Sequence, residues 1–265
     1  MKNTRTRQVY RWVRRVLDPI VKVNVWTVVR CLANIPRYGL FLRDFVRYRS
    51  MSRAEQIRFV DLYPFLDDRE YGSWTGKGQY FYQDIWALRK VRESGVTHHV
   101  DVGSRIDGFT GQCSAICAVE FVDLRKVELR LPDLSVREGD ILHLPYDDQS
   151  IESLSCLHVL EHIGLGRYVD AMNPEGSREG ARELTRVLAP GGSLYLGIPI
   201  GRERVAFNAH RFFSTKTILN FFQGLHLEEF SAITDDDVFV RNASLQDFEN
   251  ANDSCGLFHF TRRRE

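Results

Sequence analysis

One stretch decides the fold, and it reads His99-Val100-Asp101-Val102-Gly103-Ser104-Arg105-Ile106-Asp107-Gly108-Phe109. A short apolar run ends in an acid, two glycines follow, and a helical pattern then begins. This order predicts a strand, a tight turn and the start of a helix. Glycine tolerates positive φ angles and lets a ligand approach the backbone closely. The stretch is typical of α/β sheets that hold a nucleotide-like ligand, although a purely structural turn can have the same pattern.

A second acid follows at a spacing that favours nucleoside binding. The run 119–123 predicts a strand and ends in Asp123, 22 residues after Asp101. An ionised carboxylate offers two acceptor oxygens, which suit the two hydroxyls of a ribose. The glycines and this acid together indicate such a site more strongly than either feature alone.

Further strands each end at a polar residue. We expect strands at about 97–102, at 119–123, directly before Gly139, and at 153–157 and 193–199. Helices are expected at 109–118, from Glu161-His162 onward, and at 215–223, and strands at 227–233 and 256–261 close the chain. Since the carboxyl ends of parallel strands meet at one edge of a sheet, Asp101, Asp123, Asp140 and His158 are expected to line one crevice.

Composition restricts the class of protein. The 265 residues are 43% hydrophobic and allow one large α/β domain with an appendage. The five cysteines are scattered and form no C-x-x-C pair, so we expect a reducing compartment, no disulfide framework and no zinc site, and we assign no residue to a metal. We expect no transmembrane helix, because eighteen uncharged apolar residues occur nowhere in a row, and no secretory signal.

The N-terminus is strongly basic. Residues 1–49 carry twelve Lys or Arg and two acids, a local +10 that leaves −9 for the remainder. Tyr38, Phe41, Leu42, Phe45 and Val46 form an apolar helical stripe among arginines. We expect a basic amphipathic arm at 1–50 and one domain at 51–265. The arm suits an anionic membrane surface, or packing on the body or a partner; we do not expect a nucleic-acid partner. A glycine- and aromatic-rich run, 71–79, predicts a loop over a ligand or over the sheet edge.

Several motifs together resemble one known family. They are V-D-V-G, the acid that ends the second strand, G-D-I-x-x-L-P-Y-D-D, C-L-H-V-L-E-H-I and R-V-L-A-P-G-G-S-L-Y-L-G-I-P. Over about 80–263 the chain resembles class I S-adenosylmethionine-dependent methyltransferases. The run S-C-L-H-V-L-E-H-I-G-L-G-R-Y is similar to an uncharacterised domain-of-unknown-function branch associated with bacterial surface-glycan genes.

The resemblance implies a fold and a cofactor site. The fold would be a Rossmann-like, seven-stranded, mostly parallel sheet with an antiparallel last strand and helices on both faces. S-adenosyl-L-methionine would be the cofactor, bound by Asp101, Gly103, Ser104, Gly108, Asp123, Asp140, Ile141 and His158. The chain departs from the family at 104–107, where Ser-Arg-Ile-Asp replaces a usual glycine, so we expect a variant pocket.

The function implied by the resemblance is O-methylation of a sugar or glycan intermediate. A hydroxyl acceptor needs a base, and the candidates are Glu161, His162 and His210. The alternatives are a methyltransferase for a small metabolite or lipid quinone, and a non-catalytic adenosyl-binding scaffold in a membrane glycan-assembly complex. We expect a cytoplasmic protein, peripheral at the inner face of the membrane through residues 1–50.

Overall fold

The computed structural model describes residues 25–51, 62, 78–168, 170–207 and 209–264. The contacts divide the chain into two units, Met1–Thr75 and Gly76–Glu265, which are described separately. The first 24 residues of the predicted arm and residues 71–77 of the loop predicted at 71–79 lie outside the described residues. The domain boundary expected after residue 50 stays a prediction.

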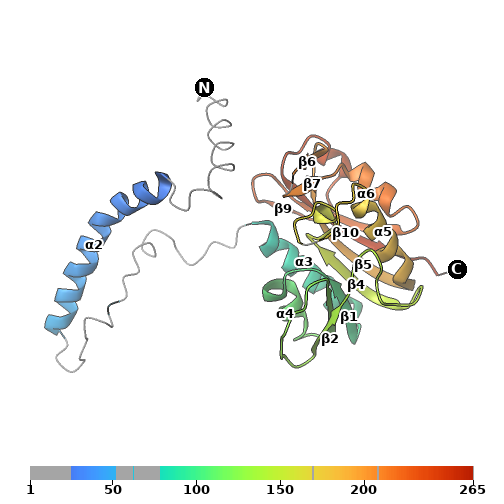
Figure 1. The fold of residues 1–265 in the computed structure, drawn as a ribbon, viewed down its shortest axis with the longest axis horizontal. Helices are drawn as coiled ribbons and strands as arrows, with labels where there is room; N and C mark the ends of the chain where they lie inside the picture. The colour runs from blue at the N-terminus through green and yellow to red at the C-terminus, as the bar shows by residue number, and fades with distance from the viewer. Residues whose placement is uncertain (1–24, 52–61, 63–77, 169, 208, 265) are drawn as a thin grey trace. The chain divides into compact units, whose positions relative to one another are not determined.

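The larger unit is built on a mostly parallel sheet (Figure 1). Its strands lie in the order β3 (Leu134–Glu138), β2 (Ala118–Asp123), β1 (His98–Val102), β4 (Ile151–Leu157), β5 (Leu188–Ile200), β10 (Ser254–Thr261), β8 (His226–Ile233) and β9 (Phe239–Val240). The first five are parallel, and β10 runs antiparallel to both β5 and β8. This confirms the predicted α/β sheet with an antiparallel last strand. Three strands were not predicted. One is β9, a two-residue edge that pairs with the end of β8, and the other two, β6 (Arg204–Ala206) and β7 (His210–Phe212), form a separate two-stranded antiparallel sheet.

Helices cover both faces of the sheet. One face packs against α3 (Gln79–Ser94), the π-helical turn η2 (Ile106–Thr110) and α4 (Gly111–Cys113), with a core around Trp86, Phe109, Phe121 and Tyr195. The other face packs against α5 (Gly176–Val187), α6 (Thr215–Phe221) and the short turn η4 (Leu245–Phe248), over a larger apolar core. A parallel sheet covered on both faces explains why its strands are almost continuously apolar.

Side chains of β1 alternate between the two cores. Val100 and Val102 face the α5 side, whereas His99 lies against the rings of Phe109 and Tyr195 on the α3 side. The His99 ring nitrogens contact two serine hydroxyls of β4, Ser153 at 2.7 Å and Ser155 at 2.8 Å. Burial lowers the pKa of His99 to about 3, so the ring joins β1 to β4 as a neutral group.

Two predicted helices are wrong in extent. The helix expected at 109–118 is limited to the turn η2 and the three residues of α4. The helix expected from Glu161-His162 onward is a single 3-10 turn, η3 (Leu160–His162), and α5 begins at Gly176. Gly164 and Gly166 have positive φ angles of 79° and 65°, which end the helical turn η3 and form a loop between η3 and α5.

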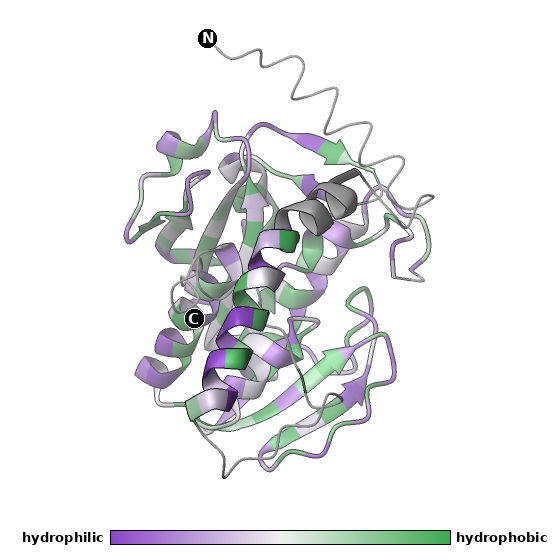
Figure 2. Cartoon of the chain, turned by 90° about the vertical axis from the view of Figure 1, so that its left-hand side faces the viewer, coloured by the Kyte–Doolittle hydropathy of each residue, from purple (hydrophilic) through white to green (hydrophobic). Residues whose placement is uncertain are grey.

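In the smaller unit the described helix is α2 (Val25–Met51). Its exposed apolar side chains Ile35, Tyr38, Leu42 and Val46 recur every three or four residues and therefore share one face. The exposed Arg43 and Arg47 lie on another face, so apolar and polar segments alternate along the helix (Figure 2). No helix in the described part of the chain is long and apolar enough to cross a membrane.

Candidate active site

The carboxyl ends of β1, β2 and β4 open onto a cavity of about 930 Å³. Such an edge of a parallel sheet is where α/β folds bind ligands. Six of the predicted site residues line this cavity from the strand ends and the turns after them: Gly103, Ser104, Asp123, Asp140, Ile141 and His158. The base candidate His162 lines it as well. The two remaining cofactor candidates, Asp101 and Gly108, lie behind the wall.

Asp101 is fully buried below the turn that follows β1. Its carboxylate accepts hydrogen bonds from Ser104 N at 3.1 Å, Ser104 Oγ at 2.7 Å, Thr110 Oγ1 at 3.1 Å and the Ser155 hydroxyl. Burial raises the pKa of Asp101 to about 6, although these hydrogen bonds oppose the shift. The carboxylate therefore shapes the turn from inside, and it reaches the cavity through Ser104.

The variant segment Ser104–Asp107 forms part of the cavity wall. Ser104 Oγ also accepts the Leu157 amide at 3.1 Å, which joins the turn to β4. Arg105 and Asp107 pair with each other at 3.0 and 2.8 Å and point toward solvent. The cavity is therefore retained despite the missing glycine.

Gly108 supports the site from the α3 side. A Cβ at this position would lie 2.5 Å from Asp84 Oδ2, so a larger residue would have to displace the Asp84 carboxylate of α3. Burial raises the pKa of Asp84, against the effects of Gln83, Arg105 and His158. Gly108 thus positions the turn and does not line the cavity.

The second and third strands supply the acids predicted for the adenosine. Asp123 lines the cavity with its carboxylate paired to Arg125, and Leu124 lies beside it. Asp140 Oδ1 accepts the Leu142 amide at 2.9 Å, and Ile141 and Leu142 add apolar surface. A carboxylate with two acceptor oxygens for the two ribose hydroxyls, together with apolar walls for a base, suits a nucleoside.

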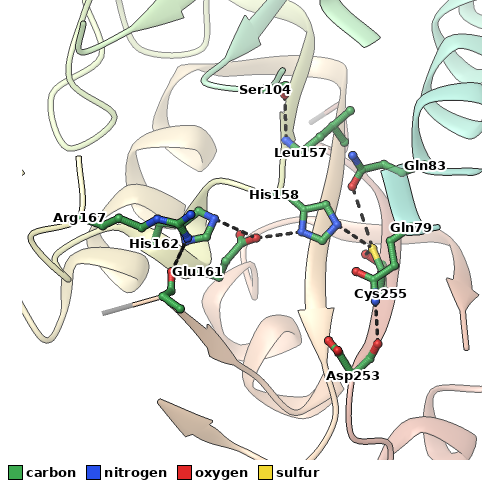
Figure 3. Close-up of polar contacts among 12 residues, drawn as sticks. Gln79, Gln83, Ser104, Leu157, His158, Glu161, His162, Arg167, Asp253 and Cys255 are labelled. Carbon is green, nitrogen blue, oxygen red and sulfur yellow. Dashed lines mark hydrogen bonds and ion pairs between the residues drawn. The ribbon is translucent and has the colours of Figure 1, made fainter. Parts of the chain in front are cut away.

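A polar cluster follows β4 and consists of the side chains of His158, Glu161 and His162 (Figure 3). His158 has a positive φ of 56°, and its Nδ1 lies 2.9 Å from Glu161 Oε1 while its Nε2 lies 3.5 Å from Cys255 Sγ. Burial would lower the pKa of His158, but Cys255 and Glu161 outweigh it and raise the pKa well above its ordinary value. We therefore assign His158 as the cation that neutralises Glu161, which is 1% exposed.

His162 is the member of this cluster suited to proton transfer. Its Nδ1 donates to the Ala209 carbonyl at 2.7 Å, which leaves Nε2 as the basic nitrogen. The nearest acid to Nε2 is Glu161 Oε1, at 3.6 Å. The third base candidate, His210, has its ring 6.1 Å from that of His162 and is not among the residues that line the cavity. Burial lowers the pKa of His210.

Three further residues complete the cavity and were not predicted as site residues. Tyr80, at the start of α3, lies 4.8 Å from the His158 ring, and Tyr168 lies 5.5 Å from the His162 ring. Arg125 follows Asp123 by two residues. The aromatic run before α3 and the sequence G-L-G-R-Y were the available signals for the two tyrosines, whereas nothing in the sequence marks Arg125.

Comparison with known proteins bears on the fold. A family profile described as "Caenorhabditis protein of unknown function, DUF268" matches residues 134–255. No curated protein matches the chain.

Solved structures share the architecture at low identity. The [4+2]-cyclase SpnF is 13% identical with a TM-score of 0.52, over 74% of this chain and 87% of that one. A putative sarcosine dimethylglycine methyltransferase from Galdieria sulphuraria is 11% identical with a TM-score of 0.50, over 69% and 87%. The N-methyltransferase NodS from Bradyrhizobium japonicum WM9, in complex with S-adenosyl-L-homocysteine, is 15% identical with a TM-score of 0.46, over 74% and 90%.

The chain has a Rossmann-like methyltransferase fold. A cyclase and a methyltransferase are both among its structural neighbours, so the fold by itself does not determine the reaction. The reaction has to be argued from the residues of the cavity.

The pKa of Asp101 gives a testable pH dependence. Its carboxyl binds a proton at about pH 6 in the folded chain, against 3.8 as its ordinary value. A raised folded pKa stabilises the protein below the unfolded pKa, and this contribution is lost as pH rises through the folded pKa. Between pH 7 and pH 4 the wild type should therefore gain about 2 kcal/mol of unfolding free energy relative to Asp101→Asn, in urea titrations.

His99 titrates with the opposite sign, but it is present in both proteins and cancels in the difference. Asp107→Asn serves as the control, because Arg105 lowers the pKa of the exposed Asp107 and the difference should not grow on acidification. Parallel pH profiles for the wild type and Asp101→Asn would contradict the assignment.

Proposed function

We propose that this chain is an S-adenosylmethionine-dependent methyltransferase that methylates a hydroxyl oxygen of a sugar or glycan intermediate. The observation that carries the proposal is the cavity itself. Gly103, Asp123 and Asp140 line it from the ends of β1, β2 and β3, and His162 lines it from the turn after β4. One cavity therefore contains residues suited to bind the cofactor and a residue suited to deprotonate the acceptor.

The residues present fit the cofactor. The Gly103 backbone, at a φ of 73°, opens the β1 end to the methionine part, and Asp123 can accept the ribose hydroxyls. Asp140 and Ile141 would lie along the adenine. S-adenosylmethionine, when bound, supplies a methyl group that is already activated as a sulfonium. The protein therefore mainly has to orient the two reactants.

The acceptor half supports proton removal from a hydroxyl. In this proposal His162 Nε2 takes the proton as the acceptor oxygen forms its bond to the methyl carbon and the carbon–sulfur bond breaks. The Ala209 carbonyl fixes the Nδ1–H tautomer, and Glu161 stabilises the resulting imidazolium at 3.6 Å. The Tyr80 and Tyr168 rings offer flat surfaces against which a sugar ring can pack. The sugar itself is proposed from the resemblance of the sequence motifs.

Cofactor binding is the first test. Calorimetry should show that the wild type binds S-adenosylmethionine and S-adenosylhomocysteine. Asp123→Ala should weaken both by about 1–3 kcal/mol, because charge-assisted hydrogen bonds to the ribose are lost. Asp107→Asn, at the exposed end of the same wall, should bind as the wild type does. No binding by the wild type would overturn the proposal.

Methyl transfer is the second test. Radiolabel from S-adenosylmethionine should pass to a sugar fraction of a cell extract and be recovered as a base-stable methyl ether. His162→Gln should slow this transfer by about 10²–10⁴-fold while cofactor affinity is kept. His226→Gln, on the exposed start of β8, is the control. Label recovered in quinones, or loss of transfer in His210→Gln but not in His162→Gln, would count against the assignment.

We also propose that the N-terminal arm contacts an anionic membrane from the cytoplasmic side. The +10 charge of residues 1–49 and the apolar face of α2 support this placement. Such contact would bring the active-site unit near membrane-bound glycan intermediates.

Flotation of the full chain with vesicles tests the arm. The wild type should float with vesicles that contain phosphatidylglycerol and less with pure phosphatidylcholine. The double variant Leu42→Gln/Val46→Gln should lose at least about tenfold in binding, because two aliphatic side chains no longer enter the interface. Leu40→Gln, on the arginine side of the helix, should float normally. Equal flotation of the double variant and the wild type would refute membrane contact through α2.

A further inference from the structure

Arg125 pairs with the Asp123 carboxylate, the group proposed to bind the ribose of the cofactor. Its Nε and Nη2 donate to the two oxygens of Asp123, each at 2.8 Å, and its backbone amide donates to Oδ1 at 2.8 Å. Both residues line the cavity. The guanidinium therefore covers Asp123 at the position where a ribose diol would bind.

The Asp123 carboxylate has too few acceptor sites to bind Arg125 and both ribose hydroxyls at the same time. A carboxylate has about four lone-pair sites, two on each oxygen. Arg125 uses both sites of Oδ1 and one of Oδ2, which leaves one site for two ribose hydroxyls. The diol can bind through both oxygens only after the guanidinium has left. The Asp123 side chain is 7% exposed and that of Arg125 is 57% exposed, so the arginine is the partner free to move.

The Arg125 guanidinium also lies against the ring of Tyr168, a residue that we place at the acceptor end of the cavity. It already lies 5.2 Å from the centre of the Tyr168 ring, and Arg167 lies 4.9 Å from the same ring. The loop that carries Tyr168 is held by Asp170, which accepts the amides of Gly164, Gly166 and Tyr168. Release of Arg125 from Asp123 would leave its guanidinium beside the Tyr168 ring, on which Arg167 also lies, with its two fork donors free to bind another anion.

We propose that Arg125 exchanges partners during binding: the ribose of the cofactor displaces it from Asp123, and it then binds an oxyanion of the acceptor. The acceptor would carry a phosphate or carboxylate group, because a guanidinium fork recognises these anions with two parallel hydrogen bonds. The exchange makes binding ordered, with the cofactor first and the anionic acceptor second. This inference rests on the proposed cofactor site.

A second arginine provides a matched control. Arg137 also pairs with a carboxylate, since its Nε donates to Glu120 Oε1 at 2.6 Å, and its guanidinium lies 5.0 Å from the centre of the Tyr146 ring. Neither Arg137 nor Glu120 lines the cavity. A general effect of removing an arginine would appear in both variants, whereas the exchange concerns Arg125 alone.

Calorimetry with S-adenosylhomocysteine tests the displacement. Arg125→Gln should bind it about fivefold more tightly than the wild type, because no ion pair has to be broken. Arg137→Gln should bind it with wild-type affinity. Arg125→Lys, which keeps the charge without the fork, should fall between the other two. If Arg125 instead held the cofactor, Arg125→Gln would bind more weakly, and the exchange would be refuted.

Inorganic phosphate tests the second half of the proposal. With saturating S-adenosylhomocysteine, the wild type should bind phosphate at least about tenfold more tightly than without it, and phosphate should tighten S-adenosylhomocysteine by the same factor. Arg125→Gln should lose this coupling and Arg137→Gln should keep it. Acetate at equal ionic strength distinguishes a carboxylate site from a phosphate site. Phosphate affinity that does not depend on S-adenosylhomocysteine would overturn the second step.

The outcomes separate this inference from the function on which it rests. A wild type that binds no S-adenosylhomocysteine overturns both the cofactor site and the exchange. A wild type that binds it, with an unchanged affinity in Arg125→Gln, overturns the exchange and leaves the cofactor site intact.

Discussion

The site depends on one buried carboxylate. An ionised acid inside a protein is costly unless its oxygens are hydrogen-bonded, and Asp101 satisfies this requirement with donors from three places in the chain. Ser104 comes from the turn, Thr110 from η2, and Ser155 from the neighbouring strand. Meeting the needs of one carboxylate therefore fixes the turn after β1 against β4, and with it the wall of the cavity.

The acids at the strand ends differ in how easily they can exchange partners. Asp101 has no exposed surface, and its donors belong to the fold. Asp140 accepts a backbone amide of its own turn and keeps its second oxygen available. Asp123 is paired with a long side chain that can swing into solvent. Three acids that look alike in sequence thus become a structural group, a fixed wall and an exchangeable ligand site.

Much of the sheet edge could be predicted because its signals are local. The apolar runs and the polar residues that end them placed Asp101, Asp123, Asp140 and His158 at one crevice. The last three line the cavity, whereas Asp101 is buried behind its wall. Gly108 also carried a local signal but packs on Asp84, because α3 approaches the turn from a distant part of the sequence. The pairing of His158 with Cys255, 97 residues away, depends on β10 and on no local pattern. Arg125 carries no signal, since an arginine after a strand is ordinary until its partner is known.

The assignment of His162 as the base follows from the way in which Glu161 is paired with its two neighbouring histidines. Glu161 is buried with one oxygen partnered by His158 and without a hydrogen-bond partner for Oε2 in the described part of the chain. One imidazolium suffices to neutralise it, and the raised pKa of His158 gives that role to the ring between Glu161 and Cys255. The Nδ1 of His162 donates to the Ala209 carbonyl, and its Nε2 lies 3.6 Å from Glu161 Oε1. A proton taken up at Nε2 gains a favourable electrostatic interaction with Glu161, which is what a base for a neutral hydroxyl requires.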